Sequence, residues 1–228
     1  MKFLLSLFIL YFNSIFSQTN ERIEDSAHIY WQPNTNLTEK DFQFDGTKEE
    51  NAEKYCEMTK LCSCAATNIN LIIDIPKSKN KREREKVYIV PVFDKIKSYN
   101  LVENDSIGIK QQKLVFDLEE YMARYIRQEF KKIKTQFKDK YGLLITWHKV
   151  ILNEAQKKKE KLIYEYTLDV YLEPKINAYK DWRIKVDLML KDLREFATTE
   201  EECERFIFKK VTLENYEESV FLGCKNHN

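Results

Sequence analysis

The strongest hydrophobic pattern in the chain runs from residue 111 to residue 133, where apolar side chains recur every three or four positions. This spacing collects them on one face of an α-helix, and charged residues such as Glu119 and Arg127 fall on other faces. The apolar positions are Leu114, Val115, Leu118, Tyr121, Met122, Tyr125, Ile126 and Ile133. The pattern predicts a long amphipathic helix over 111–133.

A second stripe of helical spacing lies at residues 178–197 and also carries large apolar side chains. Its members are Trp182, Val186, Met189, Leu193 and Phe196. We expect a second long helix here that packs on the core.

Strands are predicted where apolar and polar residues alternate. Residues 67–76, "TNINLIIDIP", have isoleucine or leucine at every second position from residue 69 onward. Residues 86–93, "KVYIVPVF", form a second strand, in which Pro91 suits an edge or a bulge. A short strand is expected at "HIYW", residues 28–31, within a polar stretch rich in turn-forming residues.

Two further strands are predicted at residues 143–152, "LLITWHKVIL", and 161–174, "KLIYEYTLDVYLEP". The charged stretch between them, "NEAQKKKE", would form the tip of a hairpin, with a helical conformation of this part as the alternative. Residues 204–224 add one or two strands. We therefore expect an α+β fold, with a small, mainly antiparallel, twisted sheet packed on the central helix at about 111–133 and the helix at about 178–197 behind it.

The N-terminus has the pattern of a secretory signal peptide. Lys2 precedes an unbroken apolar run, which gives way to polar sequence at Gln18 and is too short for a convincing membrane anchor. Cleavage near Ser17 would remove residues 1–17. We expect a secreted or periplasmic mature chain, residues 18–228, that forms a single domain without a transmembrane span.

Charge and cysteine content narrow the classes of partner and site. The chain has 38 Lys and Arg against 37 Asp and Glu, so a nucleic acid partner is not indicated. Five cysteines in an exported chain suggest disulfides, with at least one cysteine unpaired or intermolecular. Cys203 and Cys224 could bracket the C-terminal segment, a cross-link worth about 3 kcal/mol in the loop-entropy model.

Three more cysteines form a cluster at Cys56, Cys62 and Cys64. Their spacing lacks the paired C-x-x-C knuckles of a structural zinc site, which favours one disulfide and a buried thiol over a metal. The sequence leaves the pairing open.

Five short motifs follow one another along the chain. They are "IYW" at 29–31, "LTEKDF" at 37–42, "CAAT" at 64–67, "FDLEEYMAR" at 116–124 and "YKDW" at 179–182. Together they resemble a family of bacterial secreted proteins with a domain of unknown function, described as zinc-dependent, zincin-like proteases. The resemblance covers about residues 29–196 and leaves 197–228 as a C-terminal extension. It implies a zincin-like fold, in which a sheet lies over the active-site helix.

The helix of that family begins with H-E-x-x-H, whose two imidazoles bind one zinc ion while the glutamate takes a proton from zinc-bound water. With "FDLEEYMAR" as the register, the corresponding residues here are Gln111, Gln112, Lys113, Leu114 and Val115. A glutamine amide has no useful basicity, and valine has no donor atom. The resemblance therefore implies vestigial positions at Gln111, Gln112 and Val115, with no catalytic residue, metal or cofactor.

The chain has three histidines, and none lies in this helix. His227 is close to the C-terminus, and His148 is typical of a strand surface or a satisfied core position. A spatial group of His28, His148 and a carboxylate is the alternative that would preserve a metal site.

Three carboxylates follow the vestigial positions, at Asp117, Glu119 and Glu120. Adjacent helical residues point in different directions, which argues against a shared catalytic or calcium site. An ion pair from Asp117 or from Glu120 to Arg124 is the simpler hypothesis.

The sequence thus supports three functional hypotheses. The first is a secreted, catalytically inactive protein that acts by binding or scaffolding an unknown protein or envelope partner. The second is a secreted hydrolase or peptidase with a relocated metal or a metal-free site. The third is a structural protein of the cell envelope that uses its aromatic-rich strands as an interface.

Overall fold

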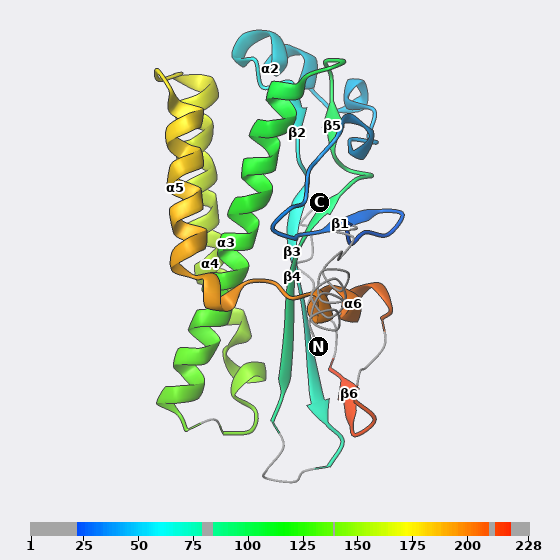
Figure 1. Ribbon diagram of the computed structural model, residues 1–228, viewed down its shortest axis with the longest axis vertical. Helices are drawn as coiled ribbons and strands as arrows, with labels where there is room; N and C mark the ends of the chain where they lie inside the picture. The colour runs from blue at the N-terminus through cyan, green and yellow to red at the C-terminus, as the bar shows by residue number, and fades with distance from the viewer. Residues whose placement is uncertain (1–21, 79–83, 139, 210–212, 220–228) are drawn as a thin grey trace, which may run out of the picture.

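The structure is a computed structural model that describes residues 22–78, 84–138, 140–209 and 213–219 (Figure 1). At its centre lies a four-stranded sheet in the order β1-β4-β3-β6, in which each neighbouring pair is antiparallel. The strands are β1 (His28–Tyr30), β3 (Thr67–Pro76), β4 (Lys86–Asp94) and β6 (Tyr216–Glu218). A two-stranded sheet pairs β2 (Ser63–Cys64) with β5 (Tyr99–Asn100).

Helices cover both faces of the larger sheet, which Figure 1 shows edge-on between α3 and α6. The helices are α2 (Ala52–Thr59), α3 (Ser106–Gln136), α4 (Leu143–Thr167), α5 (Ala178–Asp192) and α6 (Glu200–Ile207). A π-helical turn, Leu168–Leu172, follows α4, and short 3-10 turns lie at Glu39–Asp41, Gly46–Lys48 and Arg194–Phe196. The predicted α+β class with a small antiparallel sheet is confirmed.

The side chains of β3 and β4 alternate between the two faces of the sheet, which explains why helices pack on both faces. Leu71 and Ile89 belong to a core cluster with residues of α3 and α4, whereas Ile72 and Tyr88 pack with Cys203 of α6 on the opposite face. Successive side chains of a strand point to opposite faces, so one strand can serve both cores. The outer side of α3 packs against α5 through a third cluster.

The helix α3 begins where Asp105 caps it. The Asp105 side chain accepts a hydrogen bond from the backbone N–H of Gly108 at 2.8 Å. A Cβ on Gly108 would lie 2.0 Å from the Asp105 carboxylate, so glycine allows this close approach. The predicted helix at 111–133 lies inside α3. The one predicted at 178–197 is α5, which ends at Asp192 and is followed by a 3-10 turn.

The predicted hairpin at 143–174 is wrong, because most of this stretch is the single helix α4. The buried residues Leu144, His148, Ile151 and Ala155 recur every three or four positions. The helical alternative for "NEAQKKKE" is confirmed, since this stretch consists mainly of good helix formers and has no glycine or proline. The alternating apolar residues after 161 suggested a strand, although many of them also fit a helical face.

The strand β4 as a whole lies between β1 and β3, but the short β1 pairs only with residues 92–94, so Pro91 lies just beyond the paired region on that side. The carbonyl of Pro91 accepts from the N–H of Trp31 at 3.1 Å, on the β1 side. In a strand the nitrogen of a residue faces the same side as its carbonyl, so the N–H that proline lacks is not needed for pairing with β3.

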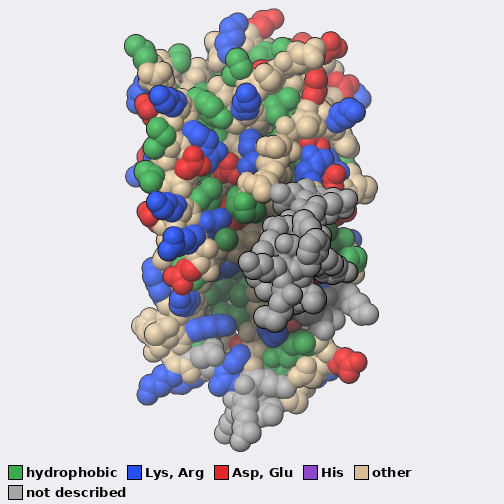
Figure 2. Space-filling model, viewed as in Figure 1, with side chains coloured by type: hydrophobic (Ala, Val, Ile, Leu, Met, Phe, Trp, Pro, Cys, Tyr) green, Lys and Arg blue, Asp and Glu red, His purple; other side chains and the backbone are tan. Residues whose placement is uncertain are grey.

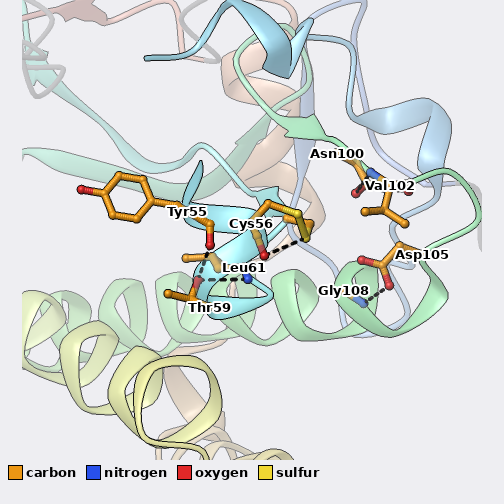
Figure 3. The surroundings of a disulfide bond; sticks show 9 residues. Tyr55, Cys56, Thr59, Leu61, Asn100, Val102, Asp105 and Gly108 are labelled. Atoms are coloured by element: carbon orange, nitrogen blue, oxygen red, sulfur yellow. Dashed lines mark hydrogen bonds between the residues drawn. A yellow bond between two sulfur atoms is a disulfide. The ribbon is translucent and has the colours of Figure 1, made fainter. Parts of the chain in front are cut away.

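The C-terminal stretch contributes one described strand, β6, as predicted, but its first residues belong to α6. A disulfide joins Cys56 of α2 to Cys62, beside the turn of Asn100 and Val102 and the start of α3 (Figure 3). Cys64 is a free and exposed thiol, which corrects the expectation of a buried one.

Cys203 is buried in the contact between α6 and the sheet, whereas its predicted partner Cys224 lies outside the described residues. The pairing of these two cysteines therefore stays a prediction. In the part of the chain that the structure describes, no helix combines the length and the apolar character needed to cross a membrane.

Candidate functional site

Gln111, Gln112 and Val115, the positions predicted to be vestigial, lie in the first half of α3 and have structural partners. The buried Gln112 accepts a hydrogen bond at Oε1 from the N–H of Ala65 at 2.9 Å, and its Nε2 donates to the hydroxyl of Tyr171 at 3.5 Å. Ala65 belongs to the "CAAT" motif, so this side chain joins α3 to the segment between β2 and β3. The Gln112 amide thus connects three parts of the fold.

The positions of the two expected ligands, Gln111 and Val115, are one helical turn apart. Val115 packs against the apolar cluster of α4 and α5, and the carbonyl of Gln111 accepts from the hydroxyl of Tyr166 at 3.0 Å. This side of α3 is therefore covered by aromatic residues from the neighbouring helices. The residues present at these positions do not fit a zinc ion, because valine has no donor atom.

The histidines occupy separate elements. His28, in β1, lies with its Nδ1 3.4 Å from Oδ1 of Asp25, while His148 is buried in α4 with its Nδ1 2.6 Å from the carbonyl oxygen of Ile145. Among the described residues, no three His, Cys, Asp or Glu side chains are grouped so as to hold a metal ion. His227 lies outside them.

Asp117 accepts hydrogen bonds from three side chains. Its Oδ1 accepts from the indole N–H of Trp31 at 2.8 Å and from the ammonium group of Lys113, and its Oδ2 accepts from Arg183 at 2.6 Å. Two cations and one neutral donor thus surround a side chain that is buried. The contact joins two of the five motifs in space and adds Arg183, the residue directly after "YKDW".

Glu120 lies one turn further along α3 than Asp117 and contacts the segment between the 3-10 turn at Arg194–Phe196 and α6. It forms the predicted ion pair with Arg124 at 2.7 Å and also accepts from the N–H and the hydroxyl of Thr198 at 3.0 and 2.5 Å. Burial raises the pKa of Glu120 above its ordinary value, although Arg127 and Arg124 oppose the shift.

Glu119 forms a third, separate contact, with Lys159 of α4 at 2.9 Å. Its other carboxylate oxygen is buried without a hydrogen-bond partner in the described part of the chain. The three carboxylates therefore have separate partners, and the adjacent Glu119 and Glu120 contact different elements.

A groove of about 490 Å³ opens beside Asp117, between α3, α5 and the segment from Trp31 to Asn36. Basic side chains from both helices line it, namely Lys110, Lys113, Arg124 and Arg183, together with the acidic Asp117 and Asp187. The Lys113 ammonium and the Arg124 guanidinium lie 5.9 and 5.3 Å from the centre of the Trp31 ring. Figure 2 shows the surrounding surface, where basic and acidic side chains are intermixed over the α5 side.

The contribution of α5 to this groove was not predicted from the sequence. Tyr179, Arg183 and Asp187 recur every four residues and so share one face of the helix, next to the face that carries the predicted apolar stripe. A polar stripe of this kind normally indicates a solvated surface. Whether this stripe faces solvent or lines a groove depends on the packing of α5 on α3, which the sequence alone does not give.

In comparisons with known proteins, the chain matches no family model, and no curated protein or solved structure is significantly similar to it.

Proposed function

We propose that this chain is a secreted, zincin-like protein without peptidase activity, which acts by binding or scaffolding a protein or envelope partner. The observation that carries the proposal is the environment of Gln112, at the position of the family's catalytic glutamate. Its amide is buried and bridges Ala65 and Tyr171. An amide in these contacts stabilises the fold and has no basicity with which to activate water.

The positions of the zinc ligands support the same proposal. Val115 contributes to an apolar cluster, and the helix face that it shares with Gln111 packs against α4 and α5. A chain that keeps the hydrophobic stripe of α3 while the ligand positions become packing residues is expected when selection acts on folding and binding alone. The groove beside Asp117 offers a concave, polar surface for such binding.

The two rival hypotheses have less support. A relocated metal site would need His28, His148 and a carboxylate together, and these histidines have separate partners. An interface built from the aromatic residues of the strands would need them to be exposed, whereas Tyr30, Tyr88 and Phe93 are at most 5% exposed.

The test is metal analysis of the purified mature protein, paired with a peptidase assay on the same sample. We expect neither stoichiometric zinc nor peptide cleavage. Stoichiometric zinc that is lost together with activity in Gln111→Ala would overturn the proposal. Gln156→Ala is the matched control, because Gln156 is an exposed glutamine of α4 whose side chain donates to exposed Glu160.

A further inference from the structure

The groove beside Asp117 presents cations from two helices toward one hollow. Lys110 and Lys113 are three residues apart on α3, so they lie on one side of that helix, and Arg183 faces them from α5. The hydroxyl of Tyr179 donates to the carbonyl of Lys110 at 3.1 Å and fixes the two helices to each other at this end. The cations are therefore held by packed elements and not by a loop.

The acidic side chains of the groove do not offset all of this charge. Asp117 is buried and already accepts from Trp31, Lys113 and Arg183. Asp187 pairs with Arg183 at 2.7 Å, but its side chain is 63% exposed, and such a pair is screened by water and salt.

Arg124 is balanced from behind by the buried Glu120, which does not line the groove. Lys110 is exposed and forms no ion pair with any residue that the structure describes. The hollow consequently carries an excess of positive charge, which favours an anionic ligand.

The rest of the lining combines apolar and aromatic side chains with the polar Thr35 and Asn36. Trp31, Pro33 and Leu190 lie opposite or beside the cations, and Tyr179 completes the wall on α5. A volume of about 490 Å³ is within the range of small-molecule sites, which combine apolar walls with a few charged groups that orient the ligand.

We propose that this groove binds a small ligand in which a carboxylate or phosphate is attached to an apolar body. The proposal rests on the proposed binding function and names the chemistry of its ligand. The anion contacts Lys110 and Lys113, with Arg183 held in place by Asp117, while the apolar part lies against Tyr179 and Leu190. Bidentate or multiple cationic contacts of this kind are the usual way in which proteins hold oxyanions.

The experiment titrates the mature protein with phenyl phosphate, phenylacetate and the uncharged phenylacetamide, and follows the indole N–H resonance of Trp31 by NMR. That N–H donates to Asp117 inside the groove, so it reports binding at this place. We expect at least one anion to shift the resonance, with an affinity that falls as salt rises, and the amide to leave it unchanged. A response to both anions, or to one, identifies which source of negative charge the groove accepts.

Variants test the named cations. Lys110→Ala is expected to weaken binding about threefold and Lys113→Gln about tenfold. The larger effect is expected at Lys113 because its ammonium group is less exposed than that of Lys110 and is therefore less screened by water. Lys157→Ala, which removes the same charge from an exposed site on α4, should leave the affinity unchanged and serves as the matched control.

The inference is overturned if the amide binds as well as the anions, if Lys110→Ala and Lys113→Gln bind like the control, or if no anion shifts the resonance at about 10 mM. These outcomes leave the proposed inactive binding function standing, because that proposal depends on zinc content and peptide cleavage. Zinc with peptidase activity would overturn the proposed function whatever the anions do.

Discussion

At the scale of single residues, the least expected feature is a fully buried ion pair that connects α6 to the sheet. Arg205 contacts Asp74 through Nε and Nη2 at 3.1 and 2.8 Å, and both side chains are at most 1% exposed. Nη2 also donates to Glu218 of β6 at 2.8 Å. The sequence gives no sign of this pair, because its partners are 131 residues apart.

Removing one partner of this pair should destabilise the fold strongly. Asp74→Ala leaves the Arg205 guanidinium buried beside only Glu218, so the free energy of unfolding should fall by about 3–5 kcal/mol. Urea denaturation measures the change. Glu195→Ala is the control, because its pair with Lys131 is mostly exposed and should be worth less than about 1 kcal/mol. Equal effects of the two substitutions would contradict the prediction.

The raised pKa of Glu120 predicts how the stability of the fold depends on pH. Because burial raises this pKa in the folded chain, the folded state holds the proton more tightly than the unfolded state. The resulting stability is fully present below the ordinary pKa of glutamate, about 4.3, and is lost as the pH rises through the folded value. In Glu120→Gln this contribution should be missing.

Urea denaturation of both proteins across this pH range tests the sign. The difference in unfolding free energy between the natural chain and Glu120→Gln should favour the natural chain most at low pH and decrease as the pH rises. A difference that grows with pH would show that Arg127 and Arg124 dominate and that the pKa is lowered. Glu195→Gln, at an exposed position, should show no such trend.

Residue patterns predicted the candidate site in part. The pair of Glu120 with Arg124 follows from helical spacing, as do the different directions of the adjacent Glu119 and Glu120. The contact of Trp31 with Asp117, 86 residues away, and the arrival of Arg183 from α5 depend on tertiary packing. Periodicity gives the face of a helix but not the element that covers it.

At the scale of elements, the predictions were most accurate where one face of an element is buried and the other is not. The helix α3 and the strands β3 and β4 carry clear apolar periods, and all three were predicted. The helix α4 was mistaken for two strands, because its C-terminal half carries apolar side chains at every second position. Helix α2 has few buried residues, which left no apolar stripe to find.

A proline substitution distinguishes the helix α4 from a hairpin. Lys157 is exposed in the middle of α4, so Lys157→Pro should remove a helical hydrogen bond and cost about 3 kcal/mol or more in unfolding free energy. At the tip of a hairpin the same change would be tolerated. Lys157→Ala controls for the lost ammonium group and should stay within about 0.5 kcal/mol of the natural chain. Thermal denaturation followed by circular dichroism gives both values.

At the scale of the whole molecule, the side chain of Arg127 links the central helix α3 to both α6 and the sheet. Arg127 of α3 reaches across the edge of the core to Glu202 of α6, with both Nε and Nη2 at 3.0 Å from its carboxylate oxygens. It also donates to the carbonyl of Phe196 at 2.8 Å, to Thr198 at 3.0 Å and to the carbonyl of Ile89 in β4. The segment that carries α6 is therefore tied to the central helix and the sheet at once.

Arg127→Ala should loosen this segment more than the rest of the molecule. The segment from Arg194 to Ile207 keeps its apolar contact through Cys203 and Phe206 and the hydrogen bonds of Thr198 to Glu120, but it loses every hydrogen bond to the Arg127 guanidinium. Because local opening requires less free energy than global unfolding, we expect amide hydrogen exchange in α6 to accelerate about tenfold or more, with β3 and β4 less affected. Mass spectrometry of peptic fragments measures the difference.

The control is Lys131→Ala, one turn further along α3. Lys131 also contacts the same segment, through Glu195 at 2.9 Å, but both side chains are more than 60% exposed, so its loss should change exchange little. If both variants accelerate exchange equally, Arg127 has no special role. If Arg127→Ala accelerates exchange uniformly over the sheet and the helices, α6 is part of one cooperative unit with the core, and the layers separate only on global unfolding.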